Sequence, residues 1–134
     1  MFSNSGNWTK TAIGLVVVMV ILQAVNVVRV VADPIGFSQY MGIGIDQNGD
    51  TSFVYVYGLR TAFIIVIACV LLFLRDFRML SVVAVAALIL PIGDAMLALR
   101  ADASFAIVVR HFLIGLYLAA TALVLGRAIR ETNS

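Results

Sequence analysis

Four long runs of apolar residues, separated by polar segments, dominate the hydrophobic pattern of this chain. They cover residues 9–32, 52–74, 79–99 and 104–129. A helix crosses the hydrocarbon core of a bilayer in about 20 residues, so each run is long enough for one transmembrane helix. The pattern predicts an all-α fold, an up-down four-helix transmembrane bundle that forms a single domain over residues 1–134.

The connections between these runs predict how the helices follow one another. RDFR and RADAS are so short that neighbouring helices must be antiparallel. The first connection, residues 33–51, is longer and begins with an aspartate-proline pair that ends the first helix. Its side chains Phe37, Tyr40 and Met41 are expected to lie on the bilayer surface or to cap the bundle. Its DQNGD segment resembles the start of a calcium loop but lacks the downstream glutamate, so it is interpreted as a polar turn.

The composition supports the membrane interpretation. Hydrophobic residues make up 63% of the chain and charged residues 12%, whereas soluble domains contain about 25% charged residues. The net charge of +2 is small and evenly spread, which argues against a nucleic-acid partner. The single Cys69 excludes a disulfide framework.

The first apolar run has an alternative interpretation as a cleaved signal peptide. Val30, Val31 and Ala32 resemble the residues before a signal-peptidase site. The run is longer than a normal signal-peptide core, however, and Arg29 lies beside the supposed cleavage point. These features favour a retained transmembrane helix.

The charged residues outside the spans predict an orientation. The N-terminus, the second loop and the C-terminus carry Lys10, Arg75, Arg78, Arg127 and Arg130, whereas the other two loops carry Arg100 alone. Positive residues favour the cytoplasmic side of a membrane. We therefore expect both termini in the cytoplasm and an integral multi-pass protein, in the cell (inner) membrane if the host is a bacterium.

Polar residues within the predicted spans gather in one layer. They are Gln23, Asn26 and Arg29 in the first span, Tyr55, Tyr57 and Arg60 in the second, Asp94 in the third, and Arg110, His111 and Tyr117 in the fourth. At 1.5 Å per residue, most lie roughly 5–15 Å inside the extracytoplasmic boundary. Pro91 predicts a kink that frees carbonyls beside Asp94. The layer therefore predicts a polar pocket that opens toward the outer face.

The charges in this layer do not balance. An ionised side chain within a span costs about 3 kcal/mol, so these residues are expected to face the interior and to pair. In a purely structural network, Asp94 would bridge Arg60 or Arg110, and Arg29 would pair with Asp33. Three arginines outnumber these two acids, which leaves one positive charge over. An anionic or electron-rich ligand would complete it, because guanidinium binds carboxylate and phosphate through two hydrogen bonds.

Residue types exclude several cofactors. A retinal Schiff base needs a lysine within a span, and Lys10 lies at the edge of the first one. Bis-histidine haem needs two histidines, and a zinc site built from one histidine and carboxylates is not favoured. Phosphate-loop and dinucleotide motifs are absent from the sequence. We therefore predict neither a cofactor nor a metal ion.

Acid–base chemistry on a lipophilic substrate, such as isomerisation, cyclisation or hydration, is compatible with the layer. The candidate catalytic residues are Asp94, His111 and Arg60, and the candidate ligand-binding residues are Asn26, Arg29, Tyr57, Arg110 and Tyr117. Two alternatives stay open. His111 could be a neutral imidazole hydrogen-bonded to Asp94 or to a carbonyl, and Tyr55 and Tyr57 could belong to an interfacial aromatic belt.

Four short motifs, within DPIGF, YGLR, PIGDAMLALR and RHFLIGLYL, resemble a family of small four-span membrane proteins classified as a domain of unknown function. The matching elements are Pro34–Phe37 after the first helix, Gly58–Arg60 in the second, Pro91–Asp94 in the third and His111 at the start of the fourth. The resemblance implies a four-span fold and marks Arg60, Asp94 and His111 as the residues to test. It implies no activity.

Three functions are weighed on these grounds. The first is an outward-facing pocket for a lipophilic, anionic or carbonyl-bearing small molecule, with acid–base catalysis. The second is a non-catalytic membrane subunit that packs against itself or a larger complex, because Gly115 and Ala119, with Ser81, Ala84 and Ala87, offer small surfaces for close helix contact. The third, a small transporter, is weakest because the cytoplasmic half lacks polar residues. The expected partners are membrane lipid, such a ligand, and a second copy or a membrane complex.

Overall fold

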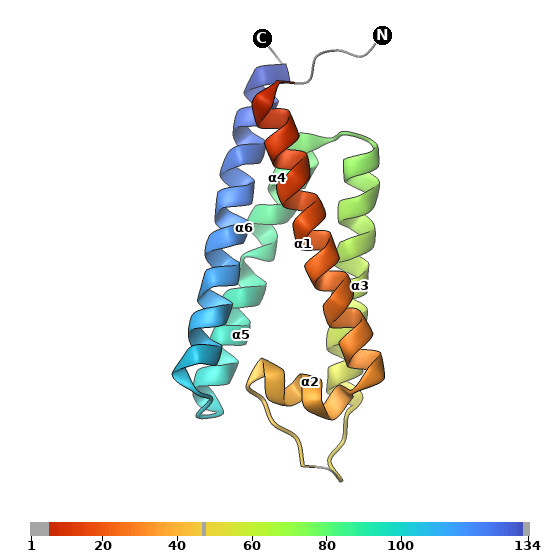
Figure 1. The fold of residues 1–134 in the computed structure, drawn as a ribbon, viewed down its shortest axis with the longest axis vertical. Helices are drawn as coiled ribbons and strands as arrows, with labels where there is room; N and C mark the ends of the chain where they lie inside the picture. Colours follow the sequence, from red (N-terminus) through yellow and green to blue (C-terminus); the bar gives the residue numbers. More distant parts are fainter. Residues whose placement is uncertain (1–5, 47, 133–134) are drawn as a thin grey trace.

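The computed structural model describes residues 6–46 and 48–132, and the regular structure in this part of the chain is entirely helical. The helices are α1 (Asn7–Ala32), α2 (Pro34–Met41), α3 (Ser52–Phe73), α4 (Phe77–Ala87), α5 (Ile89–Arg100) and α6 (Phe105–Thr132). Helices α1, α3 and α6, and α4 with α5 as one unit, are long and apolar enough to span a membrane. They run antiparallel in sequence order, and both termini lie at the same end (Figure 1). The predicted four-span, all-α fold is confirmed.

The helix ends are fixed by local hydrogen bonds. The Asp76 side chain accepts a hydrogen bond from the Met79 amide at 3.0 Å and caps α4. Helix α1 has no cap of its own from Gly6. The Glu131 carboxylate at the end of α6 accepts instead from the amide and the hydroxyl of Thr9, both at 3.1 Å. A carboxylate near a helix N-terminus is favourable because it satisfies amides that lack an intrahelical partner. It also joins the first helix to the last.

Two tight turns reverse the chain between long helices. Each contains a residue with left-handed backbone, Arg75 (φ 54°) after α3 and Asp102 (φ 53°) after α5. In both turns the next amide bonds back to a carbonyl of the finishing helix, Leu71 at 2.9 Å and Ala98 at 3.0 Å respectively. This is the geometry by which a left-handed residue ends a helix. With this turn geometry, connections as short as RDFR and RADAS can reverse the direction of the chain.

The third span is broken between α4 and α5. Leu88 separates the two helices, and its amide bonds to Val85 at 3.2 Å instead of to the residue four positions back. The cause lies one turn on, because Pro91 has no amide hydrogen to offer the carbonyl of Ala87. The break predicted from the proline is therefore present, one turn before the ring itself.

Helix α2 was not predicted from the sequence. Pro34 begins it, and the Asp33 side chain caps it by accepting from the Gly36 amide at 2.9 Å. Gly42 ends it with φ 83°, a conformation that glycine adopts without steric cost. The helix lies across the end of the bundle opposite the termini, between α1 and α3 on one side and α5 and α6 on the other (Figure 1). Of the two expectations for this segment, capping the bundle is confirmed: Phe37 is 3% exposed and Met41 7%.

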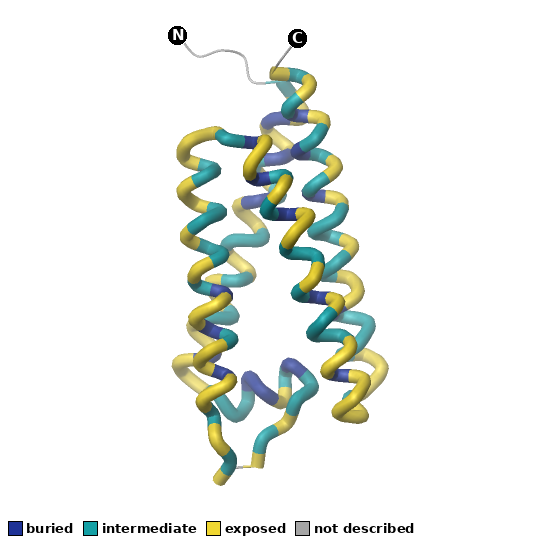
Figure 2. Tube along the Cα trace, turned by 180° about the vertical axis from the view of Figure 1, so that it is seen from behind, coloured by how far each residue is buried: buried dark blue, intermediate teal, exposed yellow. Residues whose placement is uncertain are grey.

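The buried apolar residues form two separate clusters. The larger lies toward the termini and consists of Ala12, Val16, Phe77, Leu80, Ala84, Leu125 and Ala128. The smaller lies where α2 packs on α1 and α3, and consists of Val30, Phe37, Met41 and Val54. Exposed residues recur along the long helices (Figure 2), and they include large apolar side chains such as Phe63, Phe73 and Leu123, as expected of side chains that contact lipid. The polar layer lies between the two clusters.

Small residues allow close packing inside the bundle. A Cβ at Gly58 of α3 would lie 2.7 Å from a methyl carbon of Val30 on α1, so these two helices approach through the glycine. Ala84 belongs to the larger apolar cluster, and Gly115 of α6 faces Pro91 of α5. Ala84 and Gly115 therefore serve contacts within the chain, which differs from the outer surface expected of them in the sequence analysis.

Candidate functional site

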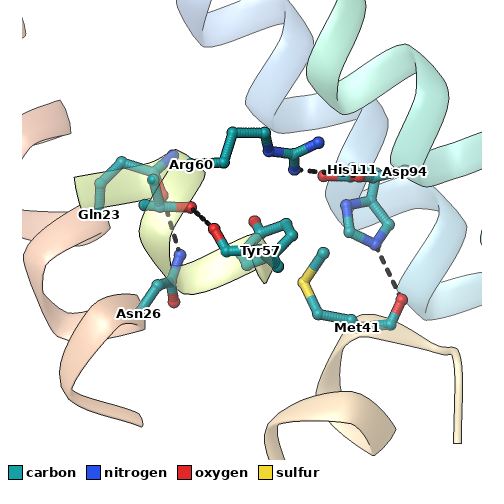
Figure 3. A network of polar contacts seen from close by, with 8 residues as sticks. Gln23, Asn26, Met41, Tyr57, Arg60, Asp94 and His111 are labelled. Atoms are coloured by element: carbon teal, nitrogen blue, oxygen red, sulfur yellow. Dashed lines mark hydrogen bonds and ion pairs between the residues drawn. The ribbon is translucent and has the colours of Figure 1, made fainter. Parts of the chain in front are cut away.

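Of the cavities lined by the polar layer, two neighbouring ones contain most of its side chains. The inner cavity, of about 90 Å³, is lined by Gln23, Asn26, Tyr57, Arg60, Asp94 and His111, together with residues of α2 and apolar side chains. Figure 3 shows these side chains converging from α1, α3, α5 and α6 above the end of α2. The outer cavity, of about 390 Å³, lies between α1 and α6 and includes Arg29, Tyr40, Arg110 and Tyr117. Asn26 and Arg110 line both.

An ion pair connects α3 to α5 across the inner cavity. The Nη2 atom of Arg60 lies 3.7 Å from Oδ1 of Asp94, and the side chains are 41% and 13% exposed. This contact is one of the two predicted for Asp94, which was expected to bridge Arg60 or Arg110. A separation of 3.7 Å is longer than a charge-assisted hydrogen bond, which is about 2.7–2.9 Å. The two groups therefore attract each other but leave donor and acceptor positions open.

His111 lies at the other edge of the inner cavity and is 2% exposed. Its Nε2 atom lies 3.2 Å from the carbonyl oxygen of Met41. A carbonyl can only accept, so Nε2 carries the hydrogen and donates it. The carbonyl partner is the one that the sequence analysis gave as the alternative to a catalytic role. The second ring nitrogen, Nδ1, faces the cavity (Figure 3).

Tyr57 lines the inner cavity together with Arg60, Asp94 and His111. Its ring lies 5.3 Å from that of Phe37 on α2, and the Arg60 guanidinium carbon lies 4.6 Å from its centroid. On the opposite wall, the Asn26 side-chain amide donates to Gln23 at 3.2 Å. Tyr57 therefore belongs to the interior, whereas Tyr55 is 49% exposed and suits the interfacial position predicted for it.

Two arginines of the outer cavity meet at one aromatic ring instead of at an acid. The guanidinium carbon of Arg110 lies 3.6 Å from the Tyr40 ring centroid, and that of Arg29 lies 5.0 Å from the same centroid. Arg110 also donates to the Tyr40 carbonyl through Nη2, while its Nε atom is buried without a hydrogen-bond partner. Within residues 6–46 and 48–132, neither arginine forms an ion pair.

Two details of the sequence-based network are corrected. Asp33 does not pair with Arg29 in the described structure, because its carboxylate caps α2. Tyr117 lines the outer cavity, but its hydroxyl donates to the Leu15 carbonyl at 2.9 Å and ties α6 to α1. The hydrogen of this hydroxyl is therefore used within the bundle, while Tyr117 stays part of the cavity lining.

Sequence reasoning missed that the α2 carbonyls belong to the site. Tyr40 and Met41 present these carbonyls to Arg110 and His111 at the C-terminal end of α2. Donors are favourable there because the last carbonyls of a helix lack intrahelical partners. The sequence carries a signal for the helix itself, since Pro34 and Gly42 mark a helix start and stop, but it carries none for the two carbonyls that are used.

No three His, Cys, Asp or Glu side chains gather to hold a metal ion anywhere in residues 6–46 and 48–132. The chemistry that the layer can supply is instead that of one carboxylate, one imidazole and three guanidinium groups. Guanidinium groups bind anions, and a carboxylate and an imidazole can accept or donate protons.

Comparison with known protein families gives a match over most of the chain. A family model described as a domain of unknown function, DUF4267, matches residues 27–125. No curated protein and no solved structure matches the chain. The matched region runs from the second half of α1 into α6, and it contains Arg29, Arg60, Asp94, Arg110 and His111.

Proposed function

The chain belongs to the DUF4267 family of domains of unknown function, and we propose that its polar layer is a membrane-embedded site for a lipophilic molecule that carries an acidic or carbonyl group. The protein is small, helical and membrane-spanning in character. With both termini in the cytoplasm, the site lies in the extracytoplasmic half of the bilayer.

One observation carries the proposal: the ionisable residues line a cavity within an apolar bundle. Arg60, Asp94 and His111 come from three helices and surround about 90 Å³ of space. Charged groups that serve packing alone are expected in close contact with each other and with additional hydrogen-bonding groups. Here the Arg60–Asp94 separation of 3.7 Å leaves positions on both groups for a ligand.

The same trio suggests acid–base catalysis on a carbonyl compound. Asp94 is the proton acceptor in this scheme, and it would take a proton from the carbon beside the carbonyl group. Arg60 would stabilise the negative charge that develops on the carbonyl oxygen, and the unprotonated Nδ1 of His111 would act as a second proton acceptor. The proton returned to a different carbon would give an isomer of the substrate.

A second candidate, a non-catalytic membrane subunit, is favoured by a different observation. Arg110 and His111 both bond to carbonyls of α2. Part of the polar layer is thus used to hold α2 across the end of the bundle. In this candidate the network fixes the fold, and α2 presents a surface to a partner.

Transport is the least favoured candidate. The half of the described bundle nearest the termini is filled by the apolar cluster around Phe77, Leu80 and Leu125. A path for ions or protons would need polar groups there.

The experiment is identification of the lipids that purify with the protein. We expect mass spectrometry to find one acidic or carbonyl-bearing lipophilic compound, enriched over the bulk lipid extract, with the unmodified protein. Asp94→Asn and Arg60→Gln should lose it while remaining folded in detergent. Asp102→Asn, an exposed acid at the same end, is the matched control and should retain it. Identical lipid profiles for all four proteins would contradict the proposal and favour the structural candidate.

A further inference from the structure

The outer cavity differs chemically from the inner one, and it points to a class of ligand. Its two cations, Arg29 and Arg110, face the ring of Tyr40 and no carboxylate within the described residues. The acid that would neutralise one of them, Asp33, caps α2. The sequence analysis counted three arginines against two acids. Without Asp33 as a partner, only Asp94 pairs with an arginine of this layer among the described residues, so two arginines are left without an acid.

Arg110 is the more buried of the two cations, and one of its donors has no partner. A guanidinium group has five N–H donors in a planar fork. In this structure one of its nitrogens donates to the Tyr40 carbonyl, and the buried Nε has no partner. Nε and a terminal nitrogen together form the edge that binds a carboxylate or phosphate through two hydrogen bonds. An anion is the partner that uses this edge.

The opening of the outer cavity faces the membrane. Its lining includes Leu22 and Val25 of α1 and Leu113 of α6. These side chains are 54%, 45% and 57% exposed on the outside of the bundle. The volume of about 390 Å³ lies within the range of small-molecule pockets. A ligand held here can extend an apolar chain between α1 and α6 into the hydrocarbon.

We infer that the outer cavity is the head-group site for an anionic amphiphile, with its carboxylate or phosphate between Arg29 and Arg110 and its apolar chain in the bilayer. The inference rests on the proposed function and names its substrate class. Because Arg110 and Asn26 line both cavities, atoms adjoining the head group reach the inner cavity, where Asp94 and His111 lie. Both guanidinium groups pack against the Tyr40 ring, which keeps them close to each other.

The test measures retention of tritium-labelled hexadecyl phosphate by the protein in phosphatidylcholine nanodiscs, with empty nanodiscs as background. Unlabelled hexadecyl phosphate, hexadecanol and inorganic phosphate serve as competitors. We expect hexadecyl phosphate to compete at least tenfold better than either of the others. Arg29→Gln and Arg110→Gln should each weaken retention at least tenfold. Arg100→Gln, an exposed arginine at the same end, should leave it unchanged. If Arg110→Gln does not fold, Arg29→Gln serves as the test, because the Arg29 side chain is exposed and, unlike that of Arg110, makes no hydrogen bond to a carbonyl of α2.

The outcomes separate this inference from the function it rests on. Equal competition by hexadecyl phosphate and hexadecanol, or retention unaffected by both substitutions, would overturn the head-group site while leaving a lipophilic ligand in place. Equal competition by inorganic phosphate would show a site for free anions and would overturn the amphiphile. If no lipophilic probe is retained and no compound purifies with the protein, the proposed function fails as well.

Discussion

Arg60 on α3 and Asp94 on α5 form an ion pair, 3.7 Å apart, between the two halves of the bundle that diverge toward α2. One half is α1 packed on α3, and the other is α5 packed on α6. The pair joins them beside a cavity, so its energetic role and its functional role can be separated by experiment.

Substitution of each partner should give unequal losses of stability. Arg60→Ala leaves Asp94 without its partner at 13% exposure, and we expect a loss of about 3 kcal/mol. Asp94→Ala leaves Arg60, which is 41% exposed and can reach solvent or head groups, so we expect about 1 kcal/mol. The measurement is equilibrium unfolding in mixed detergent micelles.

The double substitution distinguishes the two roles of this pair. If the pair is structural, the Arg60→Ala, Asp94→Ala protein should lose less stability than the sum of the single losses. If the pair serves a ligand, the single substitutions should abolish binding while the fold largely survives. Small, additive effects on both stability and binding would show that the contact matters for neither.

Removal of the donors that hold α2 should loosen that helix without unfolding the bundle. A hydrogen bond to a charged group contributes about 1.5–3 kcal/mol, so Arg110→Gln should increase hydrogen exchange of the α2 amides by roughly tenfold or more. Arg127→Gln is the matched control, because Arg127 lies on the same helix but contacts Trp8 near the termini. Unchanged exchange in α2 would mean that the Phe37 and Met41 packing holds the helix alone.

Two of the helical glycines, Gly58 and Gly93, should respond oppositely to substitution by alanine. At Gly58 the new Cβ would lie 2.7 Å from a Val30 methyl carbon, so Gly58→Ala should destabilise the protein by about 1–3 kcal/mol. At Gly93 nothing lies within 4 Å of the new atom, and Gly93→Ala should be neutral or stabilising by up to about 1 kcal/mol. Thermal unfolding in detergent compares them.

A compensating change tests the cause of the Gly58 effect. Val30→Ala in the Gly58→Ala protein removes the opposing methyl groups and should recover part of the loss. If Val30→Ala lowers the stability further instead, the contact between residues 30 and 58 does not limit how closely α1 and α3 approach.

The orientation of the bundle can be read from two engineered cysteines in a Cys69→Ser background. With both termini in the cytoplasm, an impermeant thiol reagent applied to intact cells should label Asn48→Cys and leave Thr132→Cys unlabelled until the cells are opened. Both positions are exposed in the structure. The reverse pattern would mean that the polar layer lies on the cytoplasmic side.

The break in the third span and the depth of the polar layer are two features that the local sequence predicts. Pro91 lacks an amide hydrogen wherever it stands in a helix, so a break near it follows from the residue alone. The depth of Arg60, Asp94 and His111 also follows from the sequence, because the helical rise is fixed and the spans are long. That Asp94 meets either Arg60 or Arg110 could be predicted from depth and from the antiparallel order of the helices, whereas the choice of Arg60 could not.

The four spans, their antiparallel order and the layer of buried polarity were thus determined by the sequence, since each depends on chain-local geometry and on hydrophobic length. Tertiary structure decided which groups are satisfied within that layer. Asp33 lies four residues after Arg29, yet Pro34 starts a new helix there and turns the carboxylate to the Gly36 amide. The backbone carbonyls of Tyr40 and Met41 accept hydrogen bonds from Arg110 and His111, respectively. Every residue has such a carbonyl, so no residue type could mark these two in advance.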